Sequence, residues 1–331
     1  MTWRRLLPAL IAAIVGMPAS GADAAGLPLL PVADVPLGGN ATRLDYTSVD
    51  ADRHLLFIAH LGDSAVIVFD TQARRVVARI ADVRKVHGVL AIPQLHRVYA
   101  SATGTNEVVV IDDRSWRITA RIPAGVYPDG MAYAPEVRKL YVSDEHGNTE
   151  TVIDVDRNVR VATIPLGGEV GNSQYDAASK HVFANVQTRG DLVEIDPVTD
   201  KIVGRTALPG AKGNHGLLID SDRHLAFIAC EDNAKLLVLD LRTRKVAASF
   251  GTGADPDVLA FDPGLGLLYV ASESGNTALF GFEAGTVVKA GETFSGPDAH
   301  AVAVDPGTHD VYFPLMNIDG ATALRIVHPS P

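Results

Sequence analysis

The chain has 331 residues, of which 39 are Asp or Glu and 29 are Lys or Arg, so its formal net charge is −10 at pH 7. Hydrophobic residues make up 47%, which excludes the composition of a disordered protein, and the single cysteine excludes a disulfide scaffold. The acidic balance argues against nucleic-acid binding, because nucleic-acid-binding proteins present basic surfaces to phosphate. We therefore expect a folded protein with no nucleic-acid partner.

The first 24 residues have the pattern of a secretory signal peptide. Arg4 and Arg5 precede an apolar run over residues 6–17, and Ala22-Asp23-Ala24 fits a small-residue cleavage site. The run is shorter than the roughly 20 residues that span a bilayer, and no later stretch is long and apolar enough to do so. We expect a cleaved signal peptide over 1–24 and one domain over 25–331, located in the periplasm or secreted; a retained N-terminal anchor is the alternative.

One phrase recurs along the rest of the chain: an apolar residue, Tyr or Phe, a small apolar residue, a turn, and an alternating run that ends in Asp. Its seven copies begin at Leu56, Val98, Leu140, Val182, Ala226, Leu268 and Val311. The closing aspartates are 42, 42, 42 and 44 residues apart, at Asp70, Asp112, Asp154, Asp196 and Asp240. With a fourth apolar run after most copies, this period is typical of a propeller blade. The sequence predicts an all-β, seven-bladed propeller of four-stranded blades.

The seventh copy stops after its third run, at residues 324–327, so its fourth strand is missing. Residues 30–39 resemble the end of a repeat, and we expect this segment to complete the last blade and close the ring, since an open sheet edge would promote aggregation. The recurring aspartates are expected to accept backbone N–H bonds in the turns that follow them. Cys230 lies in an apolar run and is expected to be a buried structural thiol.

These repeats resemble the YVTN-repeat family of seven-bladed β-propellers, the YncE-like group. The resemblance rests on strand phrases such as Leu140-Tyr141-Val142-Ser143 and Leu268-Tyr269-Val270-Ala271, and it covers residues 30–328. It implies an exported propeller. It implies no specific activity, because members are described mostly as propellers of uncertain role and one fold supports many functions.

The inner strand of each blade begins at the mouth of the central channel, so its first residues form the candidate site. We predict that this ring of residues binds a ligand: Tyr46, His87, Asp129, Asn172 (beside Gly171), His215, Asp257 and His300. Imidazole and carboxylate groups bind divalent metals, and His87, His215 and His300 are the predicted metal ligands. A second set from loops on the same face comprises His60, Asp144, Glu145, His146, Asn185, Glu231, Asp232, Glu273 and Asn317. The alternative is that these polar groups only line a water-filled funnel.

The sequence constrains the function of this protein less than it constrains the fold. The sequence lacks a Gly-x-Ser-x-Gly elbow, a phosphate-binding loop and a His-Glu-x-x-His motif, which favours a non-catalytic monomer that binds a small molecule, a metal or a protein on its top face. Two alternatives stay open. One is a metal-dependent hydrolase, lactonase or lyase that uses His215, Asp257, His300 and Asp129. The other is a copper- or redox-linked accessory protein. The only cofactor considered is a divalent metal at the pore mouth.

Overall fold

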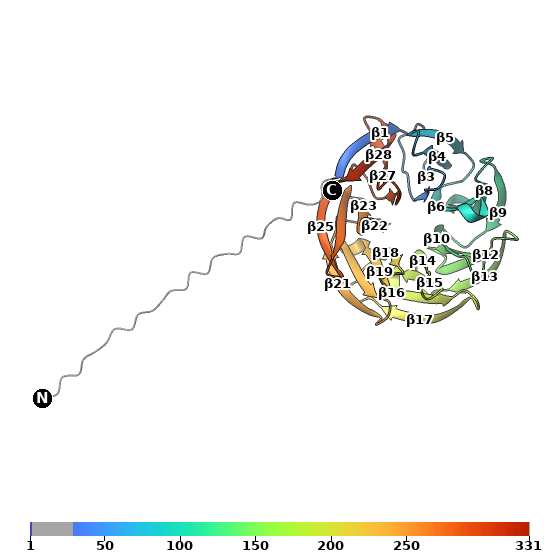
Figure 1. Cartoon of the computed structure of the whole chain (residues 1–331). Coiled ribbons are helices and arrows are strands. Elements are labelled where there is room, and N and C mark those ends of the chain that lie inside the picture. The colour runs from blue at the N-terminus through green and yellow to red at the C-terminus, as the bar shows by residue number, and fades with distance from the viewer. Residues whose placement is uncertain (2–28, 331) are drawn as a thin grey trace.

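The computed structural model describes Met1 and residues 29–330, so the predicted signal peptide lies outside the described residues apart from its first. Seven four-stranded antiparallel sheets are arranged as blades around a central axis (Figure 1). The predicted seven-bladed, all-β propeller is therefore confirmed. Within residues 29–330 no helix is long and apolar enough to cross a membrane.

The blades follow one another in chain order, and within each blade the strands run in sequence from the pore outward. The first three blades are β2 (Thr47–Asp50), β3 (Leu55–His60), β4 (Ala65–Asp70) and β5 (Arg75–Ile80); β6 (Val86–Ile92), β7 (Arg97–Ala102), β8 (Glu107–Asp112) and β9 (Ile118–Pro123); and β10 (Pro128–Ala134), β11 (Lys139–Asp144), β12 (Thr149–Asp154) and β13 (Val159–Pro165). The next three are β14 (Val170–Asp176), β15 (His181–Val186), β16 (Asp191–Asp196) and β17 (Lys201–Ala207); β18 (Asn214–Asp220), β19 (Leu225–Cys230), β20 (Lys235–Asp240) and β21 (Lys245–Gly251); and β22 (Pro256–Asp262), β23 (Leu267–Ser272), β24 (Asn276–Glu283) and β25 (Thr286–Phe294). Four short 3₁₀ turns interrupt the loops: η1 (Pro93–Leu95), η2 (Thr103–Thr105), η3 (Gln187–Arg189) and η4 (Glu231–Asn233).

The last blade joins the two ends of the described chain. Its order is β26 (Ala303–Val304), β27 (Val311–Ile318), β28 (Ala321–Pro329) and then β1 (Leu29–Pro36), which pairs antiparallel with β28. Asp34 lies opposite Arg325 in this register, and the two side chains form a bidentate ion pair with N–O distances of 2.9 and 2.6 Å. The predicted closure of the ring by the N-terminal strand is confirmed.

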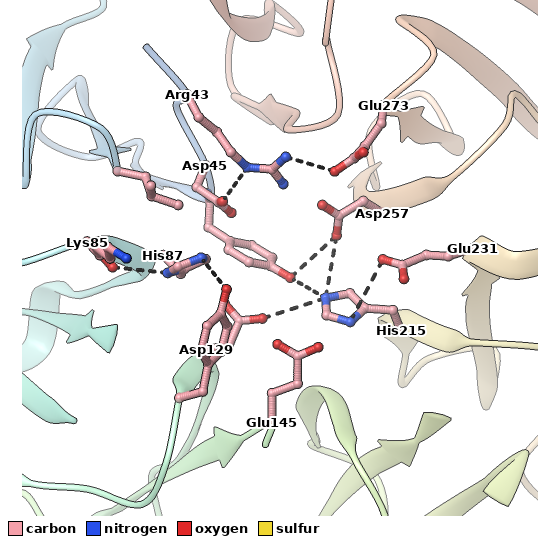
Figure 2. A pocket seen from close by; sticks show the side chains of 13 residues that line it. Arg43, Asp45, Lys85, His87, Asp129, Glu145, His215, Glu231, Asp257 and Glu273 are labelled. Carbon is pink, nitrogen blue, oxygen red and sulfur yellow. Dashed lines mark hydrogen bonds and ion pairs between the residues drawn. The ribbon is translucent and has the colours of Figure 1, made fainter. Parts of the chain in front are cut away.

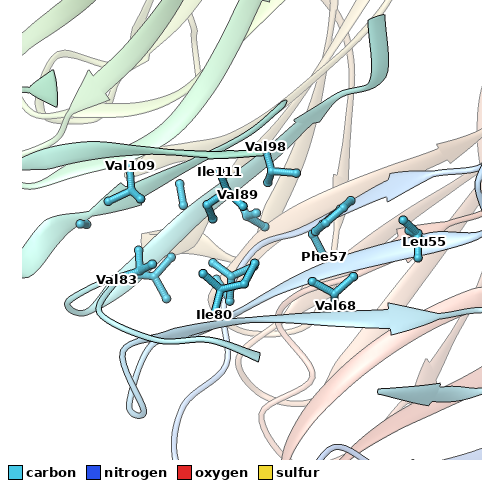
Figure 3. Packing of buried hydrophobic residues seen from close by; sticks show 14 residues of the cluster. Leu55, Phe57, Val68, Ile80, Val83, Val89, Val98, Val109 and Ile111 are labelled. Carbon is cyan, nitrogen blue, oxygen red and sulfur yellow. The ribbon is translucent and has the colours of Figure 1, made fainter. Parts of the chain in front are cut away.

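The two middle strands of a blade read as continuous apolar runs because both of their faces are covered by neighbouring blades. Between the first and second blades, for example, Phe57 and Val68 pack against Val89, Val98 and Ile111 (Figure 3). The outermost strands instead alternate between exposed and partly buried residues, as in β5 and β21. This difference gives each repeat its recognisable sequence pattern.

The recurring aspartates have the predicted structural role. Asp112 Oδ1 accepts hydrogen bonds from the backbone N–H groups of Arg114 and Ser115, and Asp240 Oδ1 accepts them from Arg242 and Thr243. These hydrogen bonds, with that of the Ser115 hydroxyl, hold the pKa of Asp112 below its usual value. The aspartates therefore fix the turn between the third and fourth strands of a blade.

Cys230 is fully buried at the end of β19, as predicted. Burial raises the pKa of its thiol to about 11, so it stays protonated at neutral pH and is a poor nucleophile.

Candidate functional site at the pore mouth

A shared irregularity directs the ring residues into the pore. In the second to sixth blades the inner strand carries a bulge at its start: His87 and Gly88 face the single residue Ser101, and the same register shift recurs at Asp129 and His215. A bulge bends a strand and re-aims its side chains. The repeat thus places the ring residues of these five blades at equivalent positions of their inner strands.

Glycine after the ring residue lets neighbouring inner strands approach closely. A Cβ atom on Gly216 would collide with the backbone carbonyl of Asp257 in the next blade, and one on Gly88 would collide with that of Asp129. Because no side chain fits at these two positions, neighbouring inner strands lie in close contact at this height. His215 and His87, which precede the two glycines, are therefore held beside the inner strand of the next blade.

The pore mouth opens into a cavity of about 460 Å³, which we call the pore-mouth cavity. Five predicted ring residues line it, namely Tyr46, His87, Asp129, His215 and Asp257, together with Arg43, Asp45, Leu61, Lys85, Tyr127, Glu145, Glu231 and Glu273. Asn172 lines a second, smaller cavity together with Tyr46. His300 is fully buried and does not line the pore-mouth cavity.

Tyr46 connects four blades through its hydroxyl group. Its Oη lies 2.9 Å from His215 Nε2, accepts a hydrogen bond of 2.9 Å from Asn172 Nδ2 and donates a longer one of 3.4 Å to Asp257 Oδ1. These residues come from the first, fourth, fifth and sixth blades. Four of the ring residues therefore form one hydrogen-bonded network.

His215 is the centre of charge in this network (Figure 2). Its Nε2 lies 3.6 Å from both Asp129 Oδ2 and Asp257 Oδ1, and its Nδ1 lies 3.9 Å from Glu231 Oε1. Burial lowers the pKa of this imidazole, but the negative charges of Glu231, Asp257 and Asp129 outweigh that effect and raise the pKa to about 9. Burial is the largest cause that raises the pKa of Asp129, Asp257 and Glu231, the last to about 7. At neutral pH a charged imidazole thus lies among three acidic groups.

Three of these groups have the spacing of a metal site. One ligand atom each from His215, Glu231 and Asp257 lie within 4.8 Å of one another, and this is the one such group found in the described part of the chain. Glu231 begins η4, in the loop between β19 and β20. It was predicted to lie on the top face but was not predicted as a metal ligand.

The three predicted metal-binding histidines are not brought into one group within residues 29–330. His87 Nε2 lies 3.1 Å from Tyr127 Oη, and His87 Nδ1 lies 3.0 Å from the Lys85 carbonyl oxygen. His300 Nδ1 lies 3.0 Å from the Asp298 carbonyl oxygen. Of the three, His215 alone belongs to the group that has the spacing of a metal site.

Five of the nine residues in the second predicted set fall into two kinds. Glu145, Glu231 and Glu273 line the pore-mouth cavity. Asp144 is buried and accepts hydrogen bonds from Gly125 N–H and from two threonine hydroxyls, and Asn185 donates to backbone carbonyls of the next blade, so both have structural roles.

Several lining residues were missed by the sequence analysis. Lys85 and Tyr127 stand two positions before the ring residues His87 and Asp129, and their φ angles are 47° and 62°. Gly213, Asp255 and Asp298 occupy the same position with φ of 58°, 52° and 55°. This left-handed residue recurs in five blades, and its fixed distance from the ring residue is the signal that could have identified it.

Arg43 neutralises part of the cavity rim. Its Nε lies 3.2 Å from Asp45 Oδ2, and one terminal nitrogen lies 2.8 Å from Glu273 Oε1. On another part of the wall the ring of Tyr127 packs between His87 and His146, with centroid distances of 5.0 and 4.3 Å. The cavity therefore has an aromatic wall and an acidic wall.

No family model matches the sequence, and no curated protein matches it. Among solved structures, the propeller is similar to a chain of hydrazine synthase from Kuenenia stuttgartiensis, with a TM-score of 0.75 and 16% identity over 91% of this chain and 96% of that chain. It is also similar to a chain in the crystal structure of a mitotic checkpoint complex, with a TM-score of 0.76 and 11% identity over 100% of both chains. Identities this low carry the fold and nothing more. The chain is a seven-bladed β-propeller.

Proposed function

We propose that this protein is a non-catalytic binding propeller that holds a small cationic ligand in its pore-mouth cavity. The observation that carries the proposal is the charge of the lining. Six carboxylates face the cavity, whereas its lining contains two permanently charged cations, Arg43 and Lys85; the carboxylates are those of Asp45, Asp129, Glu145, Glu231, Asp257 and Glu273.

Arg43 is engaged with Asp45 and Glu273, and the other four acids lie on the side of the cavity that contains His215. The charged imidazole offsets one negative charge there, and burial raises the pKa of Asp129, Asp257 and Glu231, so a bound cation would favour the ionised forms of these acids. A cleft lined with one sign of charge and walled by protein concentrates ions of the opposite sign. A ligand with one or two positive charges fits this wall, and the stacked rings of Tyr127 and His87 offer a second, aromatic surface.

We also infer that the protein is exported. The N-terminal pattern of two arginines, an apolar run and a small-residue cleavage site supports this, and the resemblance of the repeats to the exported YVTN-type propellers agrees with it. N-terminal sequencing of the mature protein tests the inference, with Ala25 expected as the first residue.

A metal-dependent hydrolase or lyase is the second candidate, favoured by the grouping of His215, Glu231 and Asp257. The copper-linked alternative has less support, because one imidazole and two carboxylates suit harder divalent ions better than they suit Cu(I). Either alternative requires that the cavity bind a metal.

The proposal is tested by thermal unfolding in the presence of matched ligands. Mn²⁺ and putrescine serve as cationic probes, citrate as an anion and glucose as a neutral molecule. A ligand that binds only the folded protein stabilises it by about 2.7 kcal/mol at a hundred times its Kd, so at least one cation should raise the Tm and citrate and glucose should not.

Two variants test whether the cation that raises the Tm binds in the pore-mouth cavity. Asp129→Asn should weaken the cation-dependent rise in Tm, because it removes an acid that a bound cation would ionise. The matched control is Asp52→Asn, in the exposed turn between β2 and β3, which should leave the rise unchanged. Stabilisation by citrate, or no stabilisation by either cation, would contradict the proposed function.

A further inference from the structure

We propose that His215, Glu231 and Asp257 bind one divalent cation of the Mn²⁺, Fe²⁺ or Zn²⁺ class. The inference rests on the proposed function, because it names the cation and places it on one wall of the pore-mouth cavity. It also changes the ligand set expected from the sequence, since His87 and His300 are replaced by two carboxylates.

The geometry of the three side chains supports a shared ion. Their ligand atoms lie within 4.8 Å of one another, and Figure 2 shows the carboxylates of Asp257 and Glu231 pointing toward the ring of His215. Ligands at about 2.0–2.2 Å from a metal such as Zn²⁺ are about 3–3.5 Å apart. His215 Nε2 lies 3.6 Å from Asp257 and its Nδ1 lies 3.9 Å from Glu231, and one ion can use only one of these two nitrogens. Closing the site around one ion therefore requires the half-buried Glu231 side chain and the imidazole to rotate until one atom of each residue faces the ion.

The three ligands differ in how deeply their side chains are buried. His215 and Asp257 are 7% and 5% exposed and are fixed at the start of inner strands, whereas Glu231 is half-buried on η4. Because Glu231 is more accessible than the buried pair of His215 and Asp257, an ion can enter the site from the open mouth of the cavity. The three ligands also leave further coordination positions for water or for another ligand.

A neighbouring acid gives independent support for a ligand at this place. Asp129 is 4% exposed and lines the same cavity; its Oδ2 lies 3.6 Å from His215 Nε2, while its Oδ1 has no hydrogen-bond partner among the described residues. A buried polar atom without a partner is unfavourable. A cation and its bound water at His215 would give this oxygen a partner.

Other histidine–acid contacts lack the third ligand. His309 Nδ1 lies 2.7 Å from Asp262 Oδ2, and His181 Nδ1 lies 2.7 Å from Glu194 Oε1, but neither pair belongs to a group of three within residues 29–330. In these pairs the acid is the single close partner of the imidazole. At His215 the ring instead has acids near both nitrogens.

Binding replaces the proton of His215, which carries one positive charge, with a cation that carries two. The imidazole must be neutral to donate its lone pair, so the incoming ion displaces the His215 proton to solvent and takes its place between the carboxylates. No redox change and no further reactant are needed.

Titration of the protein with Mn²⁺, followed by the electron paramagnetic resonance signal of free Mn²⁺, tests the proposal. We expect one Mn²⁺ per chain in the wild type and at least a tenfold weaker affinity in Asp257→Asn. Glu231→Gln should weaken binding similarly, and its half-exposed position makes it the variant least able to disturb folding. His309→Ala, which removes a histidine from an acid pair outside the pore-mouth cavity, should bind Mn²⁺ as the wild type does.

The proposal would be overturned by no saturable Mn²⁺ binding in the wild type, or by unchanged binding in both folded carboxylate variants. Binding that is lost in His87→Ala but retained in Glu231→Gln would also overturn it. Titration of the same samples with putrescine separates this inference from the proposed function. Putrescine binding without Mn²⁺ binding would refute the metal site alone, whereas failure of both cations would refute both.

Discussion

Tyr46 in the first blade and His215 in the fifth meet across the pore, with Tyr46 Oη 2.9 Å from His215 Nε2. The two residues are 169 positions apart in the sequence. Asn172 and Asp257 bind the same hydroxyl group, so one phenol connects side chains from three other blades. The pore mouth is therefore organised by a contact that no single repeat contains.

Removing that hydroxyl group should destabilise the ring. Tyr46→Phe leaves the buried Asn172 Nδ2 without its hydrogen-bond acceptor and removes one contact each from His215 and Asp257, and we expect the free energy of unfolding to fall by about 1–3 kcal/mol. Chemical denaturation measures the change. Tyr269→Phe is the matched control: the hydroxyl of Tyr269 is buried without a hydrogen-bond partner among the described residues, so its removal should be neutral or stabilising. Equal losses in the two variants would contradict this account of Tyr46.

The closing strand should be required for stability. Deletion of residues 29–36 removes β1 and exposes the edge of β28 in the last blade, so we expect a lower Tm and a greater tendency to aggregate. Asp34→Ala provides a milder comparison. It breaks only the partly exposed ion pair with Arg325, which should cost about 0–1 kcal/mol. A deletion variant that melts at the wild-type temperature would show that β1 does not hold the ring closed.

Glu150 should make stability depend on pH. This carboxyl group is fully buried in β12, where it accepts hydrogen bonds from the hydroxyls of Ser143 and Ser173. Burial is the main cause that raises its pKa from 4.5 to about 8; the nearby charge of Asp144 raises it further, and the two serines oppose the shift. Between these two values the folded protein keeps a proton that the unfolded chain has lost. Stability should therefore fall as pH rises from about 4.5 to about 8, by at most about 1.4 kcal/mol per pH unit from this group.

Glu150→Gln keeps the shape of the protonated acid and removes its titration. The difference in unfolding free energy between this variant and the wild type should grow in favour of the variant from pH 5 to pH 8, as measured by urea denaturation. Glu107→Gln, a partly exposed carboxylate paired with Arg121, is the control and should show no such trend. A constant difference between Glu150→Gln and the wild type would refute the assignment.

The glycine after His215 should tolerate no side chain. Gly216→Ala places a Cβ atom against the backbone carbonyl of Asp257, and forcing the two inner strands apart should cost about 1–3 kcal/mol or more. Gly251→Ala is the control, because an added Cβ there meets no atom of the described chain within 4 Å. Thermal unfolding compares the two. If Gly216→Ala were as stable as Gly251→Ala, the close approach of the inner strands would not be a constraint.

The sequence was sufficient to predict the blades because each one repeats the same burial pattern. Middle-strand residues such as Val110 and Phe183 are covered on both faces in every copy, and the truncated seventh copy pointed to β1 as the missing strand. The inner strand of the last blade was less predictable: β26 has only two residues, and the carbonyl of His300 accepts a bond from Val258 N–H in the sixth blade. At His300 a hydrogen bond to the neighbouring blade takes the place of part of the hydrogen bonding within the last blade's own sheet.

The candidate site could be predicted only in part. Alignment of the copies found the ring residues, because they share one position in the repeat, and five of the blades also share one bulge there. It could not identify Glu231 as a neighbour of His215, since that contact depends on the turn of η4 and on the tertiary position of the loop. For the same reason it grouped three histidines by position, although His87 is held by Tyr127 and His300 is held by Asp298.

Anomalous diffraction from crystals of the wild-type protein soaked in MnCl₂ tests the central claim most directly, because it locates the cation. The account predicts one strong peak in the pore-mouth cavity, within coordination distance of His215, Glu231 and Asp257 and absent from crystals of the Asp257→Asn variant. A Mn²⁺ peak outside this cavity, or an empty cavity at saturating Mn²⁺, would contradict it.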